Sequence, residues 1–314
     1  MNMHAIRIHK FGGPEVLEDD TLPLPVPKGN EILVRIVAAS VNPVDRKIRE
    51  GKFAAVNDEA LPVTLGRDLS GVVESCGPAA QGITEGEAIF ALLGYDRGAY
   101  AQHVLVKPDE WARKPDNLSH VEAAAVPLAA LTAWQGMIDN GGLRSGQRVL
   151  IHGGAGGVGH LAIQIAKAKD AWVATTCSGE DLDFVRGLGA DQAIDYKTDK
   201  FENSVSDIDL VYDLIGGETQ ERSFKVLKLG GALISTLQEP DKAKALYKNI
   251  TIAHYTAKPD AYELSEIAEL LRKGSIKPVI HATYSLKDAG QAEIALAQDR
   301  VRGKIVLSIG PQWA

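Results

Sequence analysis

The stretch from Val149 to Lys169 constrains the fold of this chain more than any other. It reads VLIHGGAGGVGHLAIQIAKAK, a short apolar run, then a glycine cluster, then apolar residues at helical spacing. The pattern predicts a strand, a tight turn and a helix, and it contains G-x-G-x-x-G in that setting. Glycine lets the backbone approach a pyrophosphate, and the helix directs free N–H groups and its positive dipole end at that anion. We therefore predict a dinucleotide site, with these residues beneath the pyrophosphate: Gly156, Gly157, Val158 and Gly159.

Two other interpretations of the glycine cluster are weaker. A P-loop requires Gly-Lys-Ser or Gly-Lys-Thr, whereas His160 and Leu161 follow Gly159. A glycine turn could also serve only to pack a helix closely against a sheet. The predicted strand and helix on either side of the motif favour the cofactor site.

Size and charge exclude several classes of protein. The chain has 314 residues, which suits two domains. A formal net charge of -7 without a cluster of basic residues argues against a nucleic-acid partner. Cys76 and Cys177 imply no disulfide framework. No apolar run approaches the roughly 18–20 residues of a membrane span, and we expect a cytoplasmic protein.

Residues 1–118 are predicted to be rich in β-structure. Apolar and polar residues alternate in EILVRIVAAS (residues 31–40), as in a half-buried strand, and turn residues recur throughout the region. Short strands at this spacing predict a small barrel or sandwich. Ser119 and Glu122 form a capping-box signature before an alanine-rich helix that extends to about Asp139, with a break expected at Pro127.

Beyond this helix, predicted strands and helices alternate. Such alternation predicts a parallel sheet with helices on both faces, a doubly wound α/β fold. One more helix is predicted within residues 259–274, and the mixed tail, 276–307, is expected to belong with the first domain. The predicted strands after the glycine turn are 171–176, 192–195, 210–213, 232–236 and 250–256, and the helices are 181–188 and 219–228.

Several separated motifs together resemble the medium-chain dehydrogenase/reductase superfamily, in its zinc-free quinone oxidoreductase branch. The resemblance covers nearly the whole chain and implies a GroES-like β-rich catalytic domain (residues 1–120 and 275–314) and a Rossmann cofactor domain (residues 121–274). Besides the glycine stretch, the motifs are SVNPVD (40–45), LGRDLSGVV (65–73), GAYA (98–101), LTAW (131–134), LGAD (188–191) and GKIVL (303–307).

The resemblance also implies that no metal is bound. Zinc-dependent relatives have a Cys where this chain has Asn42, and a His-Glu pair where it has Arg67-Asp68. They also carry a four-Cys lobe that this chain lacks. Zinc requires three protein ligands for catalysis or four for structure, and the two cysteines supply neither set. A site made of His and carboxylate ligands remains formally open.

Without zinc, the acceptor must already be activated by conjugation, as a quinone or an α,β-unsaturated carbonyl compound is. Negative charge then develops on an oxygen that hydrogen-bond donors must stabilise. The resemblance places the Asn42 loop beside the nicotinamide, and Asn42 is the first candidate donor, unless its amide only caps the turn before Pro43. Lys47 and Tyr95 are further catalytic candidates, and each is alternatively a solvated or packing residue.

Other residues are assigned to the cofactor. The family implies that Thr132 contacts the nicotinamide, and Ile215, Ser235 and Leu237 lie at predicted strand ends where the ribose and nicotinamide should pass. Ser178 follows the second strand and can donate to a 2′-phosphate, and Tyr196 matches a phosphate-contacting Tyr of the family. These two residues favour NADPH, although acids follow Ser178, and NADH stays possible.

The predicted function is a zinc-independent NADPH-dependent quinone or enone reductase. One alternative is an enoyl-thioester reductase, but no basic patch is present to bind the phosphates of a carrier arm. The other is a catalytically weak NADPH-binding redox sensor or structural protein. The expected partners are the small-molecule substrate and, by analogy with relatives, a second copy in a homodimer that pairs through residues 250–256.

Overall fold

The structure is a computed structural model that describes residues 1–310. The chain divides into two compact units, which we describe separately. The first unit contains Met1–Leu128, Lys258–Arg272 and the residues from Pro278 onward, and the second contains Ala129–Ala257 and Lys273–Lys277. The sequence places the domain boundaries at residues 120 and 275. Residues 121–128 and 258–272 instead fall in the first unit, because α2 (His120–Ala124) packs on β3 and β5, and α8 (Ala261–Arg272) packs on β8.

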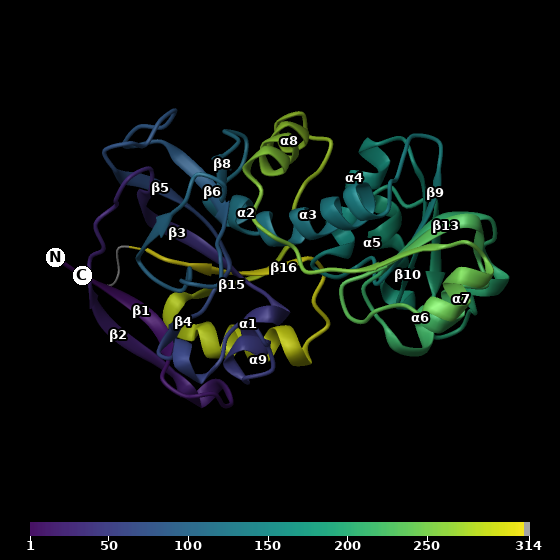
Figure 1. Cartoon of the computed structure of the whole chain (residues 1–314), viewed down its shortest axis with the longest axis horizontal. Coiled ribbons are helices and arrows are strands. Elements are labelled where there is room, and N and C mark those ends of the chain that lie inside the picture. Colours follow the sequence, from purple (N-terminus) through teal and green to yellow (C-terminus); the bar gives the residue numbers. More distant parts are fainter. Residues whose placement is uncertain (311–314) are drawn as a thin grey trace. The chain divides into compact units, whose positions relative to one another are not determined.

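The second unit is built on a six-stranded parallel sheet with the order β11-β10-β9-β12-β13-β14, as expected for a Rossmann domain (Figure 1). Its register aligns the carboxyl ends of four strands, because His152 pairs with both Thr176 and Asp213, and Asp213 pairs with Ser235. The strands are β9 (Arg148–His152), β10 (Trp172–Cys177), β11 (Gln192–Asp195), β12 (Ile208–Asp213), β13 (Leu227–Ser235) and β14 (Thr251–His254).

Helices connect these strands, and the apolar residues predicted for α4 are buried against the sheet. The alanine-rich helix is divided at Pro127, as expected, and its last part is a π-helix. The helices are α3 (Pro127–Trp134), the π-helix η3 (Gln135–Asn140), α4 (Gly159–Ala168), α5 (Leu182–Gly187), α6 (Gly217–Ser223) and α7 (Lys242–Tyr247), with 3₁₀ turns η4 (Gly179–Asp181) and η5 (Phe201–Asn203).

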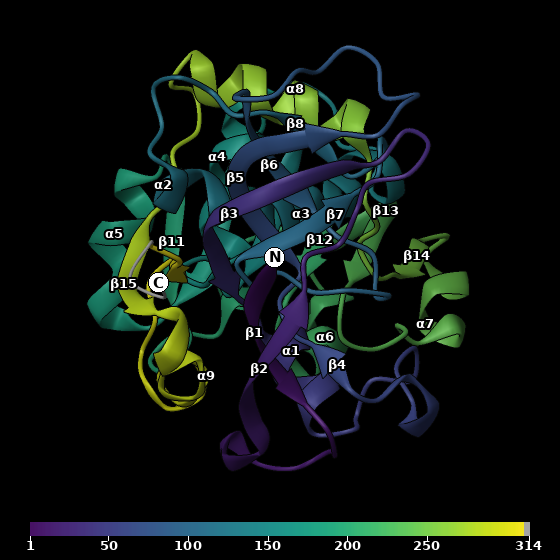
Figure 2. The ribbon, with the colours of Figure 1, turned by 90° about the vertical axis from the view of Figure 1, so that its left-hand side faces the viewer.

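The first unit contains a seven-stranded, mainly antiparallel sheet and a smaller sheet, β2-β1-β4. The β1–β2 hairpin extends away from the larger sheet (Figure 2). The last strand pairs with β3, so that the tail joins this unit as expected. The strands are β1 (Asn2–Ile8), β2 (Leu17–Pro23), β3 (Ile32–Val41), β4 (Val63–Thr64), β5 (Asp68–Cys76), β6 (Ala88–Leu92), β7 (His103–Val106), β8 (Trp111–Arg113), β15 (Ile280–Ser285) and β16 (Lys304–Ser308).

Two helices of this unit lie next to the Asn42 loop. The helix α1 (Pro43–Arg49) begins directly after β3, with Asn42 as its N-cap, and α9 (Ala289–Gln298) packs against it. Short 3₁₀ turns complete the unit: η1 (Pro14–Val16), η2 (Asp58–Ala60) and η6 (Leu286–Asp288). The main core cluster is largely aliphatic and is drawn from β1, β3, β5, β6, α9 and β16, and a smaller cluster joins α2 to β3 and β16.

One prediction about secondary structure is wrong. The helix predicted over residues 219–228 ends at Ser223, and Lys228 belongs to β13. Gly230 and Gly231, taken as a break before the strand, lie within it. The pairing with β12 shifts register between Ile208 and Leu210, and Gly230 has a φ of 72°, which fits a β-bulge.

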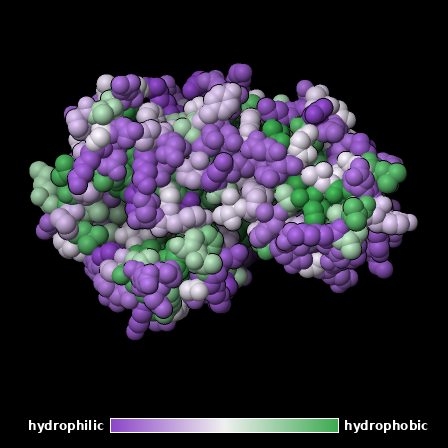
Figure 3. All heavy atoms as spheres, in the orientation of Figure 1, coloured by the Kyte–Doolittle hydropathy of each residue, from purple (hydrophilic) through white to green (hydrophobic). Residues whose placement is uncertain are grey.

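Figure 3 shows hydrophilic and hydrophobic residues interspersed over the visible face, with hydrophobic residues gathered on part of the second unit. Among residues 1–310, no helix is both long enough and apolar enough to cross a membrane.

Candidate active site

The glycine loop of the second unit connects β9 to α4 and has the shape that a pyrophosphate requires. A Cβ at Gly154 would lie 2.1 Å from Thr175 Oγ1, and one at Gly159 would lie 2.2 Å from the carbonyl oxygen of Gly153. These two glycines therefore permit close packing. A Cβ at Gly156 would meet only the Gly153 carbonyl, at 3.5 Å, and would otherwise project into open space. Gly156 is thus the position where a side chain would fill the cradle.

Unpaired N–H groups complete this cradle. Within the described part of the chain, the N–H groups of Gly157 and Val158 have no acceptor. They precede α4, a helix of 10 residues whose first turn presents a positive dipole end. The residues present therefore fit the pyrophosphate of a dinucleotide, which is the group that this fold implies.

Asp213 organises the neighbouring strand ends. Its buried carboxylate accepts hydrogen bonds from the N–H groups of Ile215 (3.0 Å) and Gly216 (2.8 Å), and from the Ser235 hydroxyl (3.0 Å). Gln220 of α6 donates to the same carboxylate at 3.0 Å. One side chain thus holds the loop after β12 and the end of β13. The sequence did not single out Asp213, although an Asp closing a predicted strand before two glycines was a usable signal.

The predicted residues at these strand ends differ in exposure. Ser235 is buried and accepts the N–H of Leu237 at 3.2 Å. Ile215 and Leu237 are 53% and 44% exposed. Exposed apolar side chains beside a held backbone loop can form the walls of a ligand site.

Thr132 lies on α3, where two tyrosines fix its backbone. Its carbonyl accepts the Tyr212 hydroxyl at 2.9 Å and also the Tyr255 hydroxyl, and the two phenol oxygens lie 2.8 Å apart. Burial raises the pKa of both phenols well above the ordinary range, so both are protonated donors. A Cβ at Gly136 would lie 2.4 Å from each tyrosine. The sequence alone did not identify this pair.

The end of β10, predicted to bind the adenosine ribose, is rich in acids. Ser178 is buried, and its hydroxyl donates to Asp181 at 2.8 Å. Tyr196 is 60% exposed, and Arg186 is paired with Asp183 at 3.0 Å. The Lys197 side chain is exposed and, within the described part of the chain, has no ion-pair partner. It is therefore a cation of this region that is available for a phosphate.

In the first unit, the Asn42 amide is held on both sides. Its nitrogen donates to Asp68 Oδ1 at 2.9 Å and, more loosely, to the Ser40 carbonyl at 3.3 Å. Its oxygen accepts the Lys304 ammonium. Asn42 is 3% exposed, and burial lowers the pKa of Lys304. The side chain is therefore oriented by charged neighbours, and its N–H toward Ser40 is the more weakly bonded of the two.

Asp45 holds the same loop, but its environment is unusual. Its Oδ2 accepts the Asn42 N–H at 2.8 Å and the Tyr100 hydroxyl at 3.3 Å, while its buried Oδ1 has no partner within the described residues. Burial, with a further contribution from the charge of Asp68, raises the pKa of Asp45 to about 7.

The other two catalytic candidates lie apart from this network. Lys47 is exposed on α1 and lines a cavity of about 300 Å³ against α9, together with Leu296 and Ala297. Tyr95 is half-buried between the Arg67 guanidinium, 3.5 Å from its ring centroid, and Phe53, at 4.8 Å. Among the described residues, no hydrogen bond or ion pair joins Asn42, Lys47 and Tyr95 to one another.

The residues at the position of the family's zinc site do not fit zinc. Arg67 is a cation, Asn42 presents an amide that is already bonded on both sides, and Asp68 accepts hydrogen bonds from Ser40, Asn42 and the Leu128 N–H. A divalent ion needs deprotonated or neutral ligands with free lone pairs. Elsewhere among residues 1–310, one group could supply three ligands, His9, Glu18 and Asp20, on the surface hairpin.

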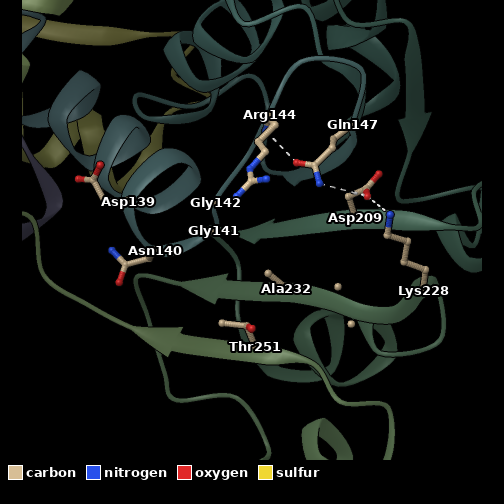
Figure 4. Close-up of a pocket in the computed structure, with 12 residues that line it drawn as sticks. Asp139, Asn140, Gly141, Gly142, Arg144, Gln147, Asp209, Lys228, Ala232 and Thr251 are labelled. Atoms are coloured by element: carbon tan, nitrogen blue, oxygen red, sulfur yellow. Dashed lines mark hydrogen bonds and ion pairs between the residues drawn. The ribbon is translucent and has the colours of Figure 1, made fainter.

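A separate cavity of about 310 Å³ lies at the amino ends of the cofactor sheet and contains none of the predicted residues (Figure 4). It is polar, and Gln147 and Lys228 both point to Asp209. It is therefore distinct from the carboxyl-end site.

The chain is similar to known proteins in both units. Residues 28–116 match the alcohol dehydrogenase GroES-like domain, and residues 188–307 match the zinc-binding dehydrogenase family. The chain is 34% identical to the mitochondrial NAD(P)H oxidoreductase RTN4IP1 of Bos taurus, over 98% of this chain and 89% of that protein. It is 36% identical to 2-methylene-furan-3-one reductase of Solanum lycopersicum, over 97% and 79%.

A solved structure is similar over the full length. The quinone oxidoreductase of Escherichia coli complexed with NADPH has a TM-score of 0.87 and 27% identity, over 97% of this chain and 99% of that one.

Proposed function

The chain belongs to the quinone oxidoreductase-like branch of the medium-chain dehydrogenase/reductase superfamily, and on that premise we propose that it is a zinc-independent, NADPH-dependent reductase of quinones or α,β-unsaturated carbonyl compounds. The observation that carries the proposal is the Asn42–Asp68–Lys304 network. It occupies the family's metal position with a hydrogen-bond donor that is fixed between two charges.

The reaction requires an acceptor that needs no metal to polarise it. The bound dinucleotide supplies two electrons as a hydride, so that NADPH, a proton and an enone give NADP⁺ and the saturated carbonyl compound, or a quinone gives the hydroquinone. The negative charge that develops on the acceptor oxygen is stabilised by fixed donors.

We assign the donor role to Asn42 and Tyr95. Asn42 has one weakly bonded N–H, and within the described residues the Tyr95 hydroxyl has no partner, so each can donate without losing a strong bond. A catalytic role for Lys47 stays a prediction, because its side chain lines the cavity between α1 and α9. A proton from water is compatible with this assignment.

We assign the cofactor to the glycine loop and the strand ends of the second unit. Gly156, Gly157, Val158 and Gly159 hold the pyrophosphate, and Ile215, Ser235, Leu237 and Thr132 line the nicotinamide half. Exposed Tyr196 and Lys197 support a 2′-phosphate and therefore NADPH. The acidic residues beside Ser178 oppose binding of a 2′-phosphate, so we expect only a moderate preference for NADPH over NADH.

The test is turnover of 9,10-phenanthrenequinone, 1,4-benzoquinone and a 2-alkenal, followed as loss of NADPH or NADH absorbance. We expect reduction of at least one acceptor, faster with NADPH, and a lower rate for Asn42→Ala with unchanged dinucleotide binding. Binding of NADPH without oxidation by any acceptor would identify a binding protein instead. Reduction of an enoyl thioester alone would favour the thioester reductase.

We also propose a homodimer that pairs through β14. This strand is the sheet edge, and large apolar side chains stand exposed nearby, with Leu229 at 77%, Leu246 at 83% and Tyr247 at 88%. Light scattering after gel filtration measures the mass directly, and a mass equal to one chain would contradict the proposal. A cytoplasmic location stays a prediction.

A further inference from the structure

Arg67 is a buried cation without an acidic partner. It is 2% exposed, and its Nε and Nη2 both donate to the Leu93 carbonyl, at 2.8 and 2.5 Å. Its Nη1 is buried and has no hydrogen-bond partner within the described part of the chain. Within residues 1–310, no carboxylate lies within ion-pair distance of it.

The other fully buried arginine shows what a structural guanidinium looks like in this protein. Arg49 is also 2% exposed, but it pairs with Glu293 at 2.6 Å and donates to the Gly12 carbonyl at 2.5 Å. That pair joins α1 to α9. Arg67 has no such ion pair, and its charge acts only at longer range on the buried Asp45 carboxyl group, where it lowers the pKa.

The guanidinium of Arg67 instead lies over an aromatic ring. It lies 3.5 Å from the centroid of Tyr95, well within cation–π range. Phe53 contacts the same ring at 4.8 Å with a tilt of 40°. Tyr95 is half-buried, and its hydroxyl has no partner within the described part of the chain. A positive charge on a phenol ring withdraws electron density, which strengthens the O–H as a hydrogen-bond donor.

We propose that Arg67 is a positioning residue that holds Tyr95 and strengthens its hydroxyl as the donor to the acceptor's carbonyl oxygen. The inference rests on the proposed function and deepens it. The substrate class that this arrangement selects is a planar conjugated carbonyl compound on whose oxygen negative charge develops during reduction. Arg67 takes the electrostatic place of a metal without touching the acceptor.

The proposal predicts that removing the charge separates activity from stability. In Arg67→Met we expect kcat for the acceptor to fall at least about tenfold, the magnitude typical of a weakened oxyanion donor, with the KM for NADPH unchanged. The midpoint of unfolding should fall less than in Arg49→Met, because only hydrogen bonds to the Leu93 carbonyl are lost and no ion pair is broken. Arg67→Lys, which keeps the charge, should recover part of kcat. Tyr95→Phe and the Tyr95→Phe/Arg67→Met double variant should have similar rates, because Arg67 acts through Tyr95.

The matched control is Arg49→Met, the same substitution at the paired buried arginine. It should lower the midpoint of unfolding while leaving kcat per folded molecule unchanged. If Arg67→Met behaves in that way, or if its effect on kcat adds fully to that of Tyr95→Phe, Arg67 is only structural and the proposal is overturned.

A binding measurement distinguishes this result from failure of the proposed function. 4-Nitrophenol is a planar mimic that turns yellow on ionisation. Near neutral pH the wild type should bind it as the yellow anion, and Arg67→Met should bind it at least about tenfold more weakly. If no acceptor is turned over but this difference is seen, the proposed reaction fails and the Arg67–Tyr95 anion site stands. Equal binding by both proteins overturns the site.

Discussion

The Ser178 hydroxyl donates to the Asp181 carboxylate across 2.8 Å, and both side chains are buried at the end of β10. The hydroxyl that is expected to bind a 2′-phosphate therefore already donates to a carboxylate. A phosphate at this place would meet a hydroxyl that is already hydrogen-bonded and would be repelled by a negative charge, which limits the preference for NADPH.

We expect Asp181→Asn to shift the dinucleotide preference toward NADPH. The change removes one negative charge and weakens the hold on Ser178, so the ratio of kcat/KM with NADPH to that with NADH should rise about fivefold or more, roughly 1 kcal/mol. Steady-state kinetics with both dinucleotides measures it. Asp170→Asn makes the same charge change beyond the other end of β10 and should leave the ratio unaltered. An unchanged ratio in Asp181→Asn would place the phosphate elsewhere.

Gly156→Val should weaken cofactor binding far more than it weakens folding. The new side chain would project into the cradle, while its Cβ meets the protein only at 3.5 Å. We expect the Kd for NADPH to rise at least about tenfold with a similar thermal midpoint. Titration by NADPH fluorescence measures the former. Gly187→Val, at another glycine with open space around it, is the control and should bind normally. Normal binding by Gly156→Val would exclude this loop as the site.

The stability of the protein should depend on pH through Asp45. Its pKa rises from the ordinary 3.8 to about 7 in the folded state, so between these values the folded protein holds a proton that the unfolded chain has lost. The contribution of this group to the free energy of unfolding therefore decreases as the pH rises from about 4 to about 7, by on the order of 4 kcal/mol.

Asp45→Asn should abolish this contribution, because an amide does not titrate and can still accept the Asn42 N–H. Urea unfolding at several pH values measures both proteins. We expect the free energy of unfolding of the variant, minus that of the wild type, to increase between pH 5 and pH 8. The difference between the two proteins cancels the contribution of His152. Burial lowers the pKa of His152 to about 4, so its protonation at low pH destabilises the folded state, whereas protonation of Asp45 stabilises it. A constant difference would show that Asp45 is charged throughout this range.

Removal of metal should leave activity intact. The Asn42, Arg67 and Asp68 set does not fit zinc, so EDTA treatment is expected to preserve kcat within error, and metal analysis should give well under one zinc per chain. Any metal that copurifies should be lost in His9→Ala, at the surface group on the hairpin, without a change in rate. Loss of activity with EDTA, restored by zinc, would contradict metal-free reduction.

Local patterns predicted those elements that depend on neighbours in sequence. The strand over residues 192–195 and the capping box at Ser119 are confirmed, because each depends on neighbours in sequence. The helix predicted to reach Lys228 failed because Gly230 and Gly231 were interpreted as a terminator, whereas pairing with β12 draws them into a strand.

The electrostatic character of the site could not be predicted from sequence. No local pattern predicted the burial of Arg67 and Lys304, which arises from packing between segments far apart. Lys304 meets Asn42 across 262 positions, and the Arg67 side chain depends on Leu93 and Tyr95 folding back over it. Such contacts are specified by tertiary structure and have no local signature.

The pairing of β16 with β3 has a consequence for the order of synthesis. Ile305 pairs with Val41, so the large sheet of the first unit lacks an inner strand until β16 leaves the ribosome. The second unit is complete at Lys277. Because domains fold as their chain becomes available, the dinucleotide-binding half should form first during translation, while the catalytic half waits with an open sheet edge that chaperones must protect.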